Sequence, residues 1–488
     1  MSKATIDFNG ILKFANLVAA ALIVIGWTQT QDNPYIDLNT IWLGLALCAQ
    51  THAALSIERR RRDPFVILLT FWMILYFELR IFTLALLPVS AVFGRFEYDV
   101  ADTNYALVFI IAANLFMYAG FFLARSKRNV SISTEQWVAH APLRVVAVLL
   151  LSLALSYLTG SYFSEGNVPR GLNFLVLYFS PTILLLMAVA YFALFRRSLG
   201  PVFALTIVAL VGIELIAHTL LGSRGAIVGF LQSCMLVGLA VRGSIKFSRR
   251  FVTIGILSLP LVALLMVGAF VISTYIRTMR NTEGMSLQVG VQAAANYGDQ
   301  DIAPQTVEYM LGGVAARVGF LDFSAEIIAH RQEYARVLNL PAYGRSIIDN
   351  LLTPGIDFYD QPKISNSLQF AYRDLGAPSK ALTAEQYQSD QFGIYGESYA
   401  LLGWVALPVL FAVAFALQRL FALMRGANPF VLAIARVVPL FVFSRLIDSF
   451  GLDWLIIDTL PLIAAVFIYG FFFPTRRVLP AATAAAHP

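Results

Sequence analysis

Long apolar segments recur along almost the whole chain, and they restrict the fold more than any other feature of the sequence. A helix needs about 20 apolar residues to cross the hydrocarbon of a bilayer, and about twelve windows approach or reach that length. They lie at 11–27, 38–56, 65–87, 105–123, 145–158, 172–195, 202–221, 226–241, 251–273, 399–421, 429–443 and 454–473. Only 13% of the 488 residues are charged and the mean hydropathy is +0.72, which excludes a water-soluble domain. We predict an all-α, polytopic integral membrane protein with about twelve transmembrane helices.

The charges between these windows predict how the chain is oriented. Cytoplasmic loops of membrane proteins carry an excess of lysine and arginine. With both termini in the cytoplasm, the inner segments hold 20 basic and four acidic residues, and the rest of the chain holds 15 basic and 25 acidic residues. We therefore predict cytoplasmic termini. The net charge of +6 then reflects topology and contact with anionic lipids, not nucleic-acid binding.

One connection, at residues 274–395, is far longer than the others and divides the chain. We predict transmembrane helices 1–9 in residues 1–273, this outer loop, helices 10–12 in residues 396–474 and a cytoplasmic tail at 475–488. Loops of such length in compact proteins are usually functional or disordered. Polar residues alternate with aromatic and aliphatic ones in this loop, so we predict that it is folded and contains amphipathic helices.

The two cysteines give no sign of a disulfide framework or a metal site. Cys48 and Cys234 both lie within predicted spans, and two such thiols cannot form a zinc site. The first apolar window is followed by Gln29 and Thr30 rather than by small residues typical of a cleavage site, so we interpret it as the first span.

Charged residues within or beside the spans are candidates for function, because each costs at least about 2.5 kcal/mol in the hydrocarbon. They are Glu78, Arg80, Glu214, Arg224, Glu397, Arg436, Arg445, Asp448 and Asp458. Most lie in the outer half of the membrane or at its outer border, whereas a coupled transporter more typically places its charges near the midplane.

The turn Gly222-Ser223-Arg224-Gly225 is the sharpest local motif. It joins two spans on the outer side, so the following helix begins there with its N-terminus outward. Unpaired N–H groups and the helix dipole favour anions at such a place, and the guanidinium of Arg224 matches phosphate oxygens. A lipid diphosphate would lie at this depth. Alternatively, Arg224 caps a neighbouring helix or pairs with Glu214.

Two further clusters lie in the long loop. Arg277 and Arg280 are spaced i, i+3 near its start, so they share one face of a continuing helix or anchor lipid headgroups. Apolar residues at helical spacing follow Arg317 and surround Asp322, which predicts an amphipathic helix that lies on the membrane or packs under the loop. Arg317 is alternatively the polar face of this helix. Arg345 is a weaker candidate in the loop interior.

The end of the loop combines a carboxylate, glycines and aromatic residues. Glu397 lies where a span begins, a position that the helix dipole favours for an acid irrespective of function. Tyr395, Tyr399 and Trp404 are typical both of an interfacial aromatic belt and of stacking against sugar rings. Both interpretations stay open at this point.

The order of these segments resembles that of the Wzy-type O-antigen and exopolysaccharide repeat-unit polymerases. The motifs are the Gly-Ser-Arg-Gly turn at 222–225, Tyr-x-Arg-x-x-Arg at 275–280, Arg-x-Gly-x-x-Asp at 317–322 and Gly-x-Tyr-Gly-Glu-x-Tyr-x-x-x-Gly at 393–403. The resemblance covers roughly residues 200 to 410. It implies a GT-C-like glycosyltransferase of the bacterial inner membrane, with one large periplasmic loop. Such an enzyme transfers a growing glycan from undecaprenyl diphosphate onto a new lipid-linked repeat unit.

The resemblance also suggests roles for individual residues. The expected diphosphate-binding residues are Arg224, Arg277, Arg280 and Arg317. Glu397 is the first candidate for the catalytic base and Asp322 the second, and leaving-group stabilisation alone is the alternative. The expected substrate-binding residues are Arg345, Tyr395 and Tyr399. No metal or cofactor is implied, and the sequence agrees in lacking an Asp-x-Asp pair at the site.

The implied partners are lipid-linked donor and acceptor oligosaccharides, with a chain-length regulator and a flippase as further candidates. Two other functions stay open: an O-antigen ligase that passes the glycan to lipid A core, and a polysaccharide or lipid transporter. The ligase reading lacks a convincing periplasmic histidine, since His330 is the only one in the loop. The transporter reading predicts midplane charges and paired halves, and neither is clear in the sequence.

Overall fold

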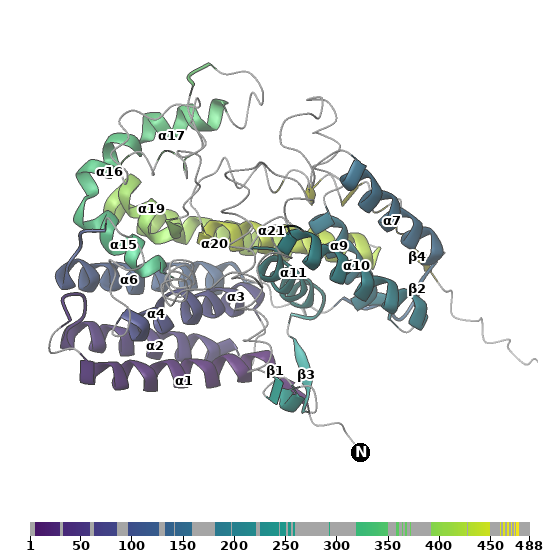
Figure 1. The fold of residues 1–488 in the computed structure, drawn as a ribbon, viewed down its shortest axis with the longest axis horizontal. Coiled ribbons are helices and arrows are strands. Elements are labelled where there is room, and N and C mark those ends of the chain that lie inside the picture. Colours follow the sequence, from purple (N-terminus) through teal and green to yellow (C-terminus); the bar gives the residue numbers. More distant parts are fainter. Residues whose placement is uncertain are drawn as a thin grey trace, which may run out of the picture.

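The fold is known from a computed structural model. The longer described ranges are 5–29, 33–58, 63–84, 96–125, 132–140, 142–158, 181–196, 198–220, 225–243, 245–249, 319–349, 392–426 and 428–448. Shorter described pieces lie at 252–254, 257–258, 292, 358–360, 364, 367, 371, 459, 462–463, 466–467, 470, 473 and 475–477. These residues are mostly helical (Figure 1).

The first group of helices is formed by the N-terminal part of the chain. Its members are α1 (Phe8–Gly26), α2 (Leu38–Glu58), α3 (Pro64–Met73), the π-helix η2 (Ile74–Glu78), α4 (Leu79–Leu84) and α6 (Val100–Ala124). Local sequence fixes where two of these helices begin. Asp63 accepts the N–H of Phe65 ahead of a first-turn proline, and Asp99 forms a capping box with Asp102.

C-terminal helices complete this group. They are α19 (Gly393–Leu402), the short 3₁₀ helix η5 (Gly403–Val405), α20 (Ala406–Leu423) and α21 (Pro429–Asp448). α20 packs along α6 at Gly120, where an added Cβ would lie 2.6 Å from the carbonyl oxygen of Phe411. At the centre, the ring of Phe65 contacts those of Phe121, Phe421 and Phe443, so α3, α6, α20 and α21 share one aromatic core.

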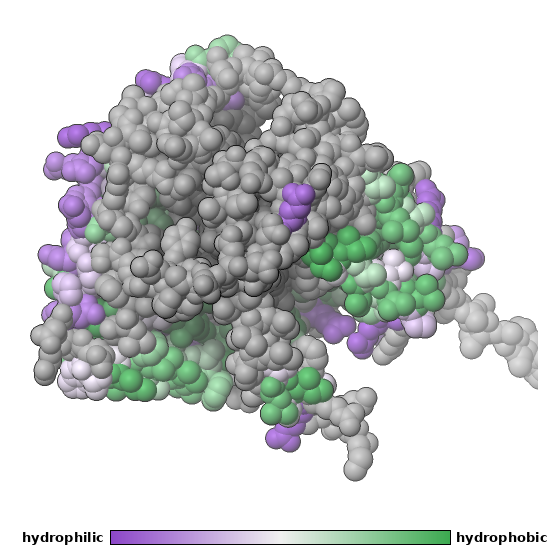
Figure 2. All heavy atoms as spheres, in the orientation of Figure 1, coloured by the Kyte–Doolittle hydropathy of each residue, from purple (hydrophilic) through white to green (hydrophobic). Residues whose placement is uncertain are grey.

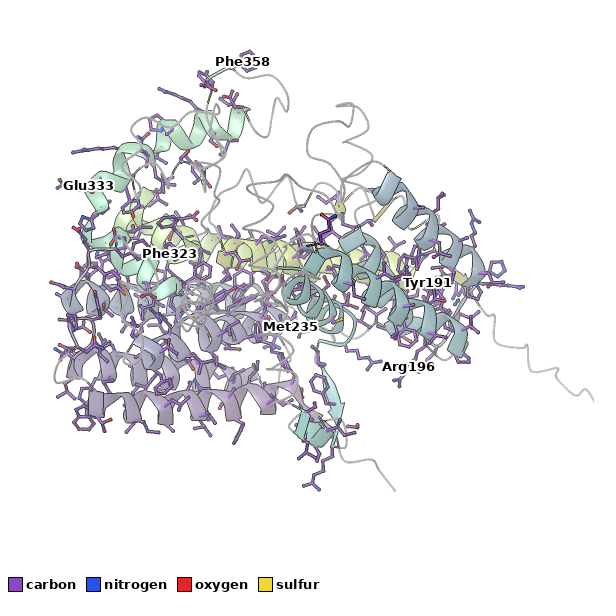
Figure 3. The ribbon with its side chains drawn as sticks, in the orientation of Figure 1. Tyr191, Arg196, Met235, Phe323, Glu333 and Phe358 are labelled. Atoms are coloured by element: carbon purple, nitrogen blue, oxygen red, sulfur yellow. The ribbon has the colours of Figure 1, made fainter. Side chains whose placement is uncertain are left out.

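A second group lies beside the first and is joined to it through α21. It contains α7 (Pro142–Leu158), α9 (Pro181–Phe195), α10 (Pro201–Leu220) and α11 (Gly225–Arg242). Tyr191 of α9 is buried at its centre (Figure 3), where its ring contacts those of Phe203, Phe430 and Phe473. The side chain of Gln232 in α11 also donates to the hydroxyl of Ser444 in α21.

Three helices from the long loop cover one end of the first group (Figure 1). They are α15 (Phe320–Ala329), α16 (Arg331–Val337) and α17 (Leu340–Ile347). Figure 3 shows Phe323 of α15 directed into the molecule and Glu333 on the outer side of α16. Residues 320–347 of this loop therefore contain three helices, and the predicted boundary at 395 falls inside α19.

Two small antiparallel pairs connect distant parts of the chain. β1 (Thr5–Asp7) pairs with β3 (Lys246–Ser248), and β2 (Trp137–Ala139) pairs with β4 (Thr475–Arg477). The N–H of Ile132, which precedes β2, also donates to the carbonyl of Val241, which precedes β3. This hydrogen bond links the segments that lead into the two strand pairs. All these segments were predicted to share one side of the membrane, and their contacts fit that grouping. The side of the membrane on which these segments lie stays a prediction.

Six described helices are long and apolar enough to cross a bilayer, which confirms a helical membrane protein. They are Phe8–Gly26, Leu38–Ile57, Pro64–Leu84, Val100–Ala124, Gly393–Leu423 and Pro429–Asp448. The apolar surface in Figure 2 gathers over α1 and α10, whereas hydrophilic residues cover α16. α7, α9, α10 and α11 occupy four further predicted windows, and most of 251–273 and 454–473 lies outside the described residues. The count of twelve spans and the GT-C-like fold stay predictions.

Candidate functional site

Among the described residues of the long loop, those of helix α15 are the most deeply buried. Every residue from Phe320 to Ile327 is buried, and the helix packs against α6, α19 and η2. Of the two predicted arrangements, a helix on the membrane surface is therefore wrong here, because such a helix would expose one polar face. The helix packs under the loop instead.

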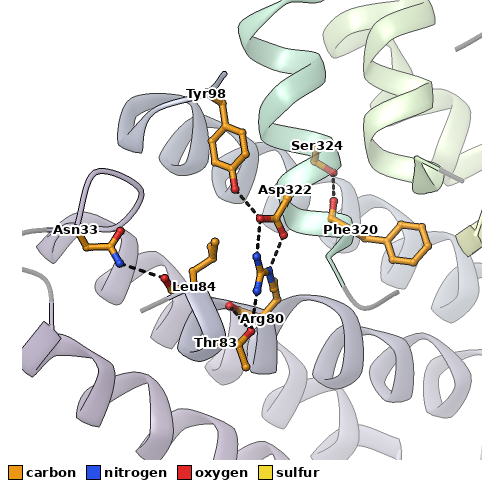
Figure 4. A network of polar contacts seen from close by, with 8 residues as sticks. All are labelled: Asn33, Arg80, Thr83, Leu84, Tyr98, Phe320, Asp322 and Ser324. Atoms are coloured by element: carbon orange, nitrogen blue, oxygen red, sulfur yellow. Dashed lines mark hydrogen bonds and ion pairs between the residues drawn. The ribbon is translucent and has the colours of Figure 1, made fainter. Parts of the chain in front are cut away.

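An ion pair between Arg80 and Asp322 fixes α15 to the membrane-spanning bundle (Figure 4). Both side chains are fully buried. Arg80 Nε donates to Asp322 Oδ2 over 2.6 Å and Nη2 to Oδ1 over 2.8 Å, which is the bidentate geometry that a guanidinium offers a carboxylate. Nη1 donates to the hydroxyl of Thr83 over 3.2 Å. The charge of Arg80 is thus compensated by a residue of the loop.

Tyr98, just before α6, adds a third segment to this cluster. Its hydroxyl donates to Asp322 Oδ1 over 2.6 Å. Burial and the negative charge of Asp322 raise the pKa of Tyr98 well above its ordinary value, so the phenol keeps its proton and remains a donor. The cluster therefore holds α4, the segment at 96–99 and α15 together.

Glycines of the motif at 393–403 allow α19 to lie close to the loop helices. Gly393 has φ +78°, and an added Cβ would lie 2.5 Å from Phe320 Cδ1. At Gly396 it would lie 3.0 Å from Ile327 Cδ1. Gly403 has φ +59°, and its Cβ would lie 2.8 Å from Arg331 Nη2. A side chain at Gly393 would force the ring of Phe320 to move, whereas at Gly396 and Gly403 the neighbours are the ends of flexible side chains. Gly393 and Gly403 also need a positive φ that other residues rarely adopt.

The first candidate for the base, Glu397, is in the interior. Its side chain is 1% exposed, and Oε1 accepts the N–H of Phe392 at the start of α19 over 3.2 Å. Glu397 lies beyond the first turn of α19, so the dipole expectation is not met by position, and its carboxylate reaches back to the residue that precedes the helix. Neighbouring Tyr395 is also buried, and it donates its hydroxyl proton to the side-chain oxygen of Asn114 in α6. In this structure Tyr395 fastens α19 to α6 and offers no exposed face to a sugar.

An aromatic cluster at the break between α19 and α20 is the accessible part of this region. Trp404 Nε1 donates to the hydroxyl oxygen of Tyr105 over 2.6 Å, and the Tyr399 hydroxyl donates to the same oxygen over 3.1 Å. The guanidinium of Arg331 lies 5.3 Å from the centre of the Tyr399 ring. Tyr105 is 38% exposed and Trp404 is 42% exposed. Both sugar stacking and an interfacial belt are compatible with these rings.

His330 connects α15 to the segment before α6. Its Nε2 lies 2.8 Å from the carbonyl oxygen of Glu97, and Glu326 and Glu333 lie 4.0 Å and 3.9 Å from its ring nitrogens. Burial lowers the pKa of His330, but the Glu97 carbonyl and the nearby carboxylates outweigh it and raise that pKa above its usual value. Burial raises the pKa of Glu326, and the N–H of Glu97 and the charge of His330 only partly oppose it.

The structure gathers some predicted site residues and leaves others apart. Asp322, Glu397, Tyr395 and Tyr399 all belong to the packed pair of α15 and α19. Arg345 lies away from them on α17, exposed, with its guanidinium 6.0 Å from the Tyr359 ring. Four predicted residues lie outside the described part of the chain: Arg224, Arg277, Arg280 and Arg317.

Sequence reasoning missed the partners that organise this region. Arg80 was marked only as a charge within a span, and Tyr98, Tyr105 and Arg331 were not singled out. The signal for Arg80 was present, since a buried arginine needs an acid, but nothing in the sequence names that acid. Among the described residues no cluster of three or more His, Cys, Asp or Glu side chains could hold a metal ion.

Comparisons with known proteins found no relationship. No protein-family model, no curated protein and no solved structure matches this chain. Function is therefore inferred from the residues and their geometry.

Proposed function

We propose that the protein is a membrane glycosyltransferase that polymerises undecaprenyl-diphosphate-linked oligosaccharide repeat units at the periplasmic face of the bacterial inner membrane. One observation supports this most. Two of the four segments that resemble the polymerases, 317–322 and 393–403, meet in the packing of α15 on α19. Gly393 of the second segment lies against Phe320 of the first, and Gly396 lies against Ile327 in the same helix α15.

In the proposed reaction an acceptor hydroxyl oxygen forms a bond to the anomeric carbon of the donor glycan while the bond from that carbon to the diphosphate breaks. The departing diphosphate takes the electron pair, and Arg224, Arg277, Arg280 and Arg317 neutralise its charge. The acceptor loses its proton to a base. Glu397 is the first candidate for this base and Asp322 the second, and both oxygens of Asp322 already accept hydrogen bonds from Arg80.

Burial of both acids favours a reaction that depends mainly on stabilising the leaving group. Asp322 is fully buried and Glu397 is 1% exposed. The two carboxylates would then hold α15 and α19 in place beneath the glycan, and the accessible rings of Tyr105 and Trp404 would contact its sugars. Arg345 would bind the glycan farther out.

The direct test is polymerisation by purified protein. Undecaprenyl-diphosphate-linked repeat units are supplied, and the products are separated by length. We expect a ladder of longer glycans from the wild type, none from Arg224→Ala, and a normal ladder from the control Arg425→Ala, which alters an exposed arginine after α20. A normal ladder from Arg224→Ala would exclude the diphosphate contact. Transfer of one glycan to lipid A core without a ladder would identify a ligase.

Glu397→Gln tests the base separately. Glutamine keeps an oxygen that can accept the N–H of Phe392, so α19 should still begin normally. Loss of the ladder with unchanged unfolding temperature would support Glu397 as the base. A ladder at the wild-type rate would show that leaving-group stabilisation suffices.

A further inference from the structure

A second buried polar cluster surrounds Glu78, at the end of the π-helix η2. The side chain of Glu78 is fully buried among α1, α2 and α6. Asn16 of α1 donates its amide N–H groups to Glu78 Oε2 over 3.0 Å and to the carbonyl oxygen of Cys48 over 3.1 Å. One carboxylate oxygen is thus satisfied. π-Helical turns within α-helices are frequent at functional sites.

The other carboxylate oxygen is not satisfied. Within the described part of the chain, Glu78 Oε1 has no hydrogen-bond partner, and the same holds for Thr51 Oγ1 and the Tyr118 hydroxyl. All three atoms are buried, and Thr51 of α2 lies beside both Glu78 and Tyr118 of α6. Buried polar atoms without partners cost about 1–3 kcal/mol each. Rotation of the two hydroxyls can pair these three oxygens in either direction, so the charges around Glu78 decide whether it carries a proton.

The charges around Glu78 exclude an ordinary ion pair. The titratable groups that face it are the Cys48 thiol and the Tyr118 phenol, neither of which supplies a positive charge. Arg80 follows on the same segment but is bound to Asp322 of α15. An ionised Glu78 would therefore be a buried charge without a counter-charge among the described residues, which costs several kcal/mol.

A hard metal cation also fits poorly. Calcium takes six to eight oxygen ligands and magnesium takes six, whereas among the described side chains at this place only Glu78, Thr51 and Tyr118 have an oxygen without a hydrogen-bond partner. The amide N–H of Asn16 points at Oε2 and would repel a cation. A proton, in contrast, needs only one acceptor.

We propose that Glu78 is a proton-binding site and is held as a neutral carboxylic acid inside the bundle. The proton on Oε1 is donated toward Thr51 Oγ1, whose own hydroxyl then donates toward the Tyr118 oxygen. One proton thus gives partners to all three unsatisfied atoms. The site is independent of glycosyl transfer. Since Glu78 and Arg80 flank Leu79, release of this proton would place a negative charge on the segment that holds α15.

The test uses infrared difference spectra of the full-length protein in detergent. At neutral pH we expect the carbonyl stretch of a protonated carboxylic acid in the wild type and in Glu135→Gln, which alters an exposed acid. The band should be absent from Glu78→Gln. An unchanged band in Glu78→Gln, or no such band in the wild type, would overturn the proposal.

A titration covers the case in which Glu78→Gln does not fold. In the wild type alone, raising the pH should abolish the band and lower the unfolding temperature as the acid ionises. Replacing choline with sodium at constant ionic strength should change neither the infrared band nor the unfolding temperature. A rise in unfolding temperature with sodium would indicate a bound cation and contradict a proton site.

Discussion

Two buried polar clusters lie two residues apart on one helical segment. Each contains a buried ionisable side chain, and the two side chains are compensated in different ways. Arg80 is compensated by the carboxylate of Asp322, a residue of the long loop. Glu78 faces an amide, a thiol and two hydroxyls, with no positive charge among them. The first cluster keeps its charges and ties separate parts of the chain together.

The difference shows what each cluster can respond to. Removing one partner of a buried ion pair leaves the other charge buried without a counter-charge, which costs several kcal/mol. The Arg80 cluster therefore holds α15 in one position. The Glu78 cluster is completed by a proton in our proposal, so it can change with conditions. Both act on the same short piece of backbone from Glu78 to Arg80.

The largest effect should come from Asp322→Asn, and the comparison is with Glu78→Gln. Asp322→Asn leaves Arg80 without a counter-charge and should reduce the free energy of unfolding by about 3–5 kcal/mol. Glu78→Gln, at equal burial, should change it by less than about 1 kcal/mol, because no ion pair is lost. Denaturant unfolding of the two variants in the same detergent measures both values.

The double variant Arg80→Met with Asp322→Leu is the matched control. It removes both charges, and most of the stability lost in Asp322→Asn should return. Equal losses in Asp322→Asn and Glu78→Gln would contradict the distinction between a paired and an unpaired cluster.

A second effect concerns packing rather than charge. Gly393→Ala places a Cβ against Phe320 at a φ of +78° and should cost about 2–4 kcal/mol, from backbone strain and overpacking. Gly344→Ala is the control, because nothing lies within 4 Å of its added Cβ. If Gly393→Ala unfolds like wild type, the ion pair alone positions α15.

Tyr98→Phe should have a smaller effect within the paired cluster. The variant removes one hydrogen bond to a charged acceptor while both members of the ion pair remain, so we expect a loss of about 1.5–3 kcal/mol. Its double-mutant cycle with Asp322→Asn should give a non-additive result, since the two side chains share this bond. Additive losses would mean that Tyr98 stabilises the protein by packing alone.

The smallest effect is a pH dependence at His330. Its folded pKa is raised above the ordinary 6.5, so its stabilising contribution is complete below pH 6.5 and is lost as the pH rises through the folded pKa. The raised pKa of Glu326 acts in the same direction. The unfolding temperature of wild type should therefore exceed that of His330→Gln most at mildly acidic pH. A difference that grows above neutral pH would contradict this assignment.

Much of the fold follows from the sequence, because lipid requires long apolar helices and the hydropathy pattern shows where they lie. The start of α21 at Pro429 matches the predicted window, and α2 begins at Leu38 as predicted. α19 differs, since the predicted window began at 399 while the helix begins at Gly393. Its first turns are buried by protein rather than lipid, and the hydropathy pattern does not distinguish these surroundings.

The candidate site was less predictable, for a physical reason. Asp322 was singled out as the second candidate base, in an expected amphipathic helix of the loop, but its partner Arg80 is 242 residues away in the sequence. Such a pairing depends on how α15 packs, which local spacing does not encode. The glycines at 393 and 396 were expected to allow close approach, and the structure adds the identity of the neighbours, Phe320 and Ile327.

The distance along the chain between Arg80 and Asp322 has a consequence for biosynthesis. At about 5–20 residues per second, the 242 residues between the two take roughly 10–50 s to synthesise. During that interval the helix that carries Arg80 is already inserted, and its guanidinium has no acid to bind. Arg80 is four residues from the end of α4, so its side chain can extend toward the lipid headgroups until Asp322 has been synthesised. The buried ion pair that fixes α15 to the bundle therefore forms only after Asp322 has been synthesised.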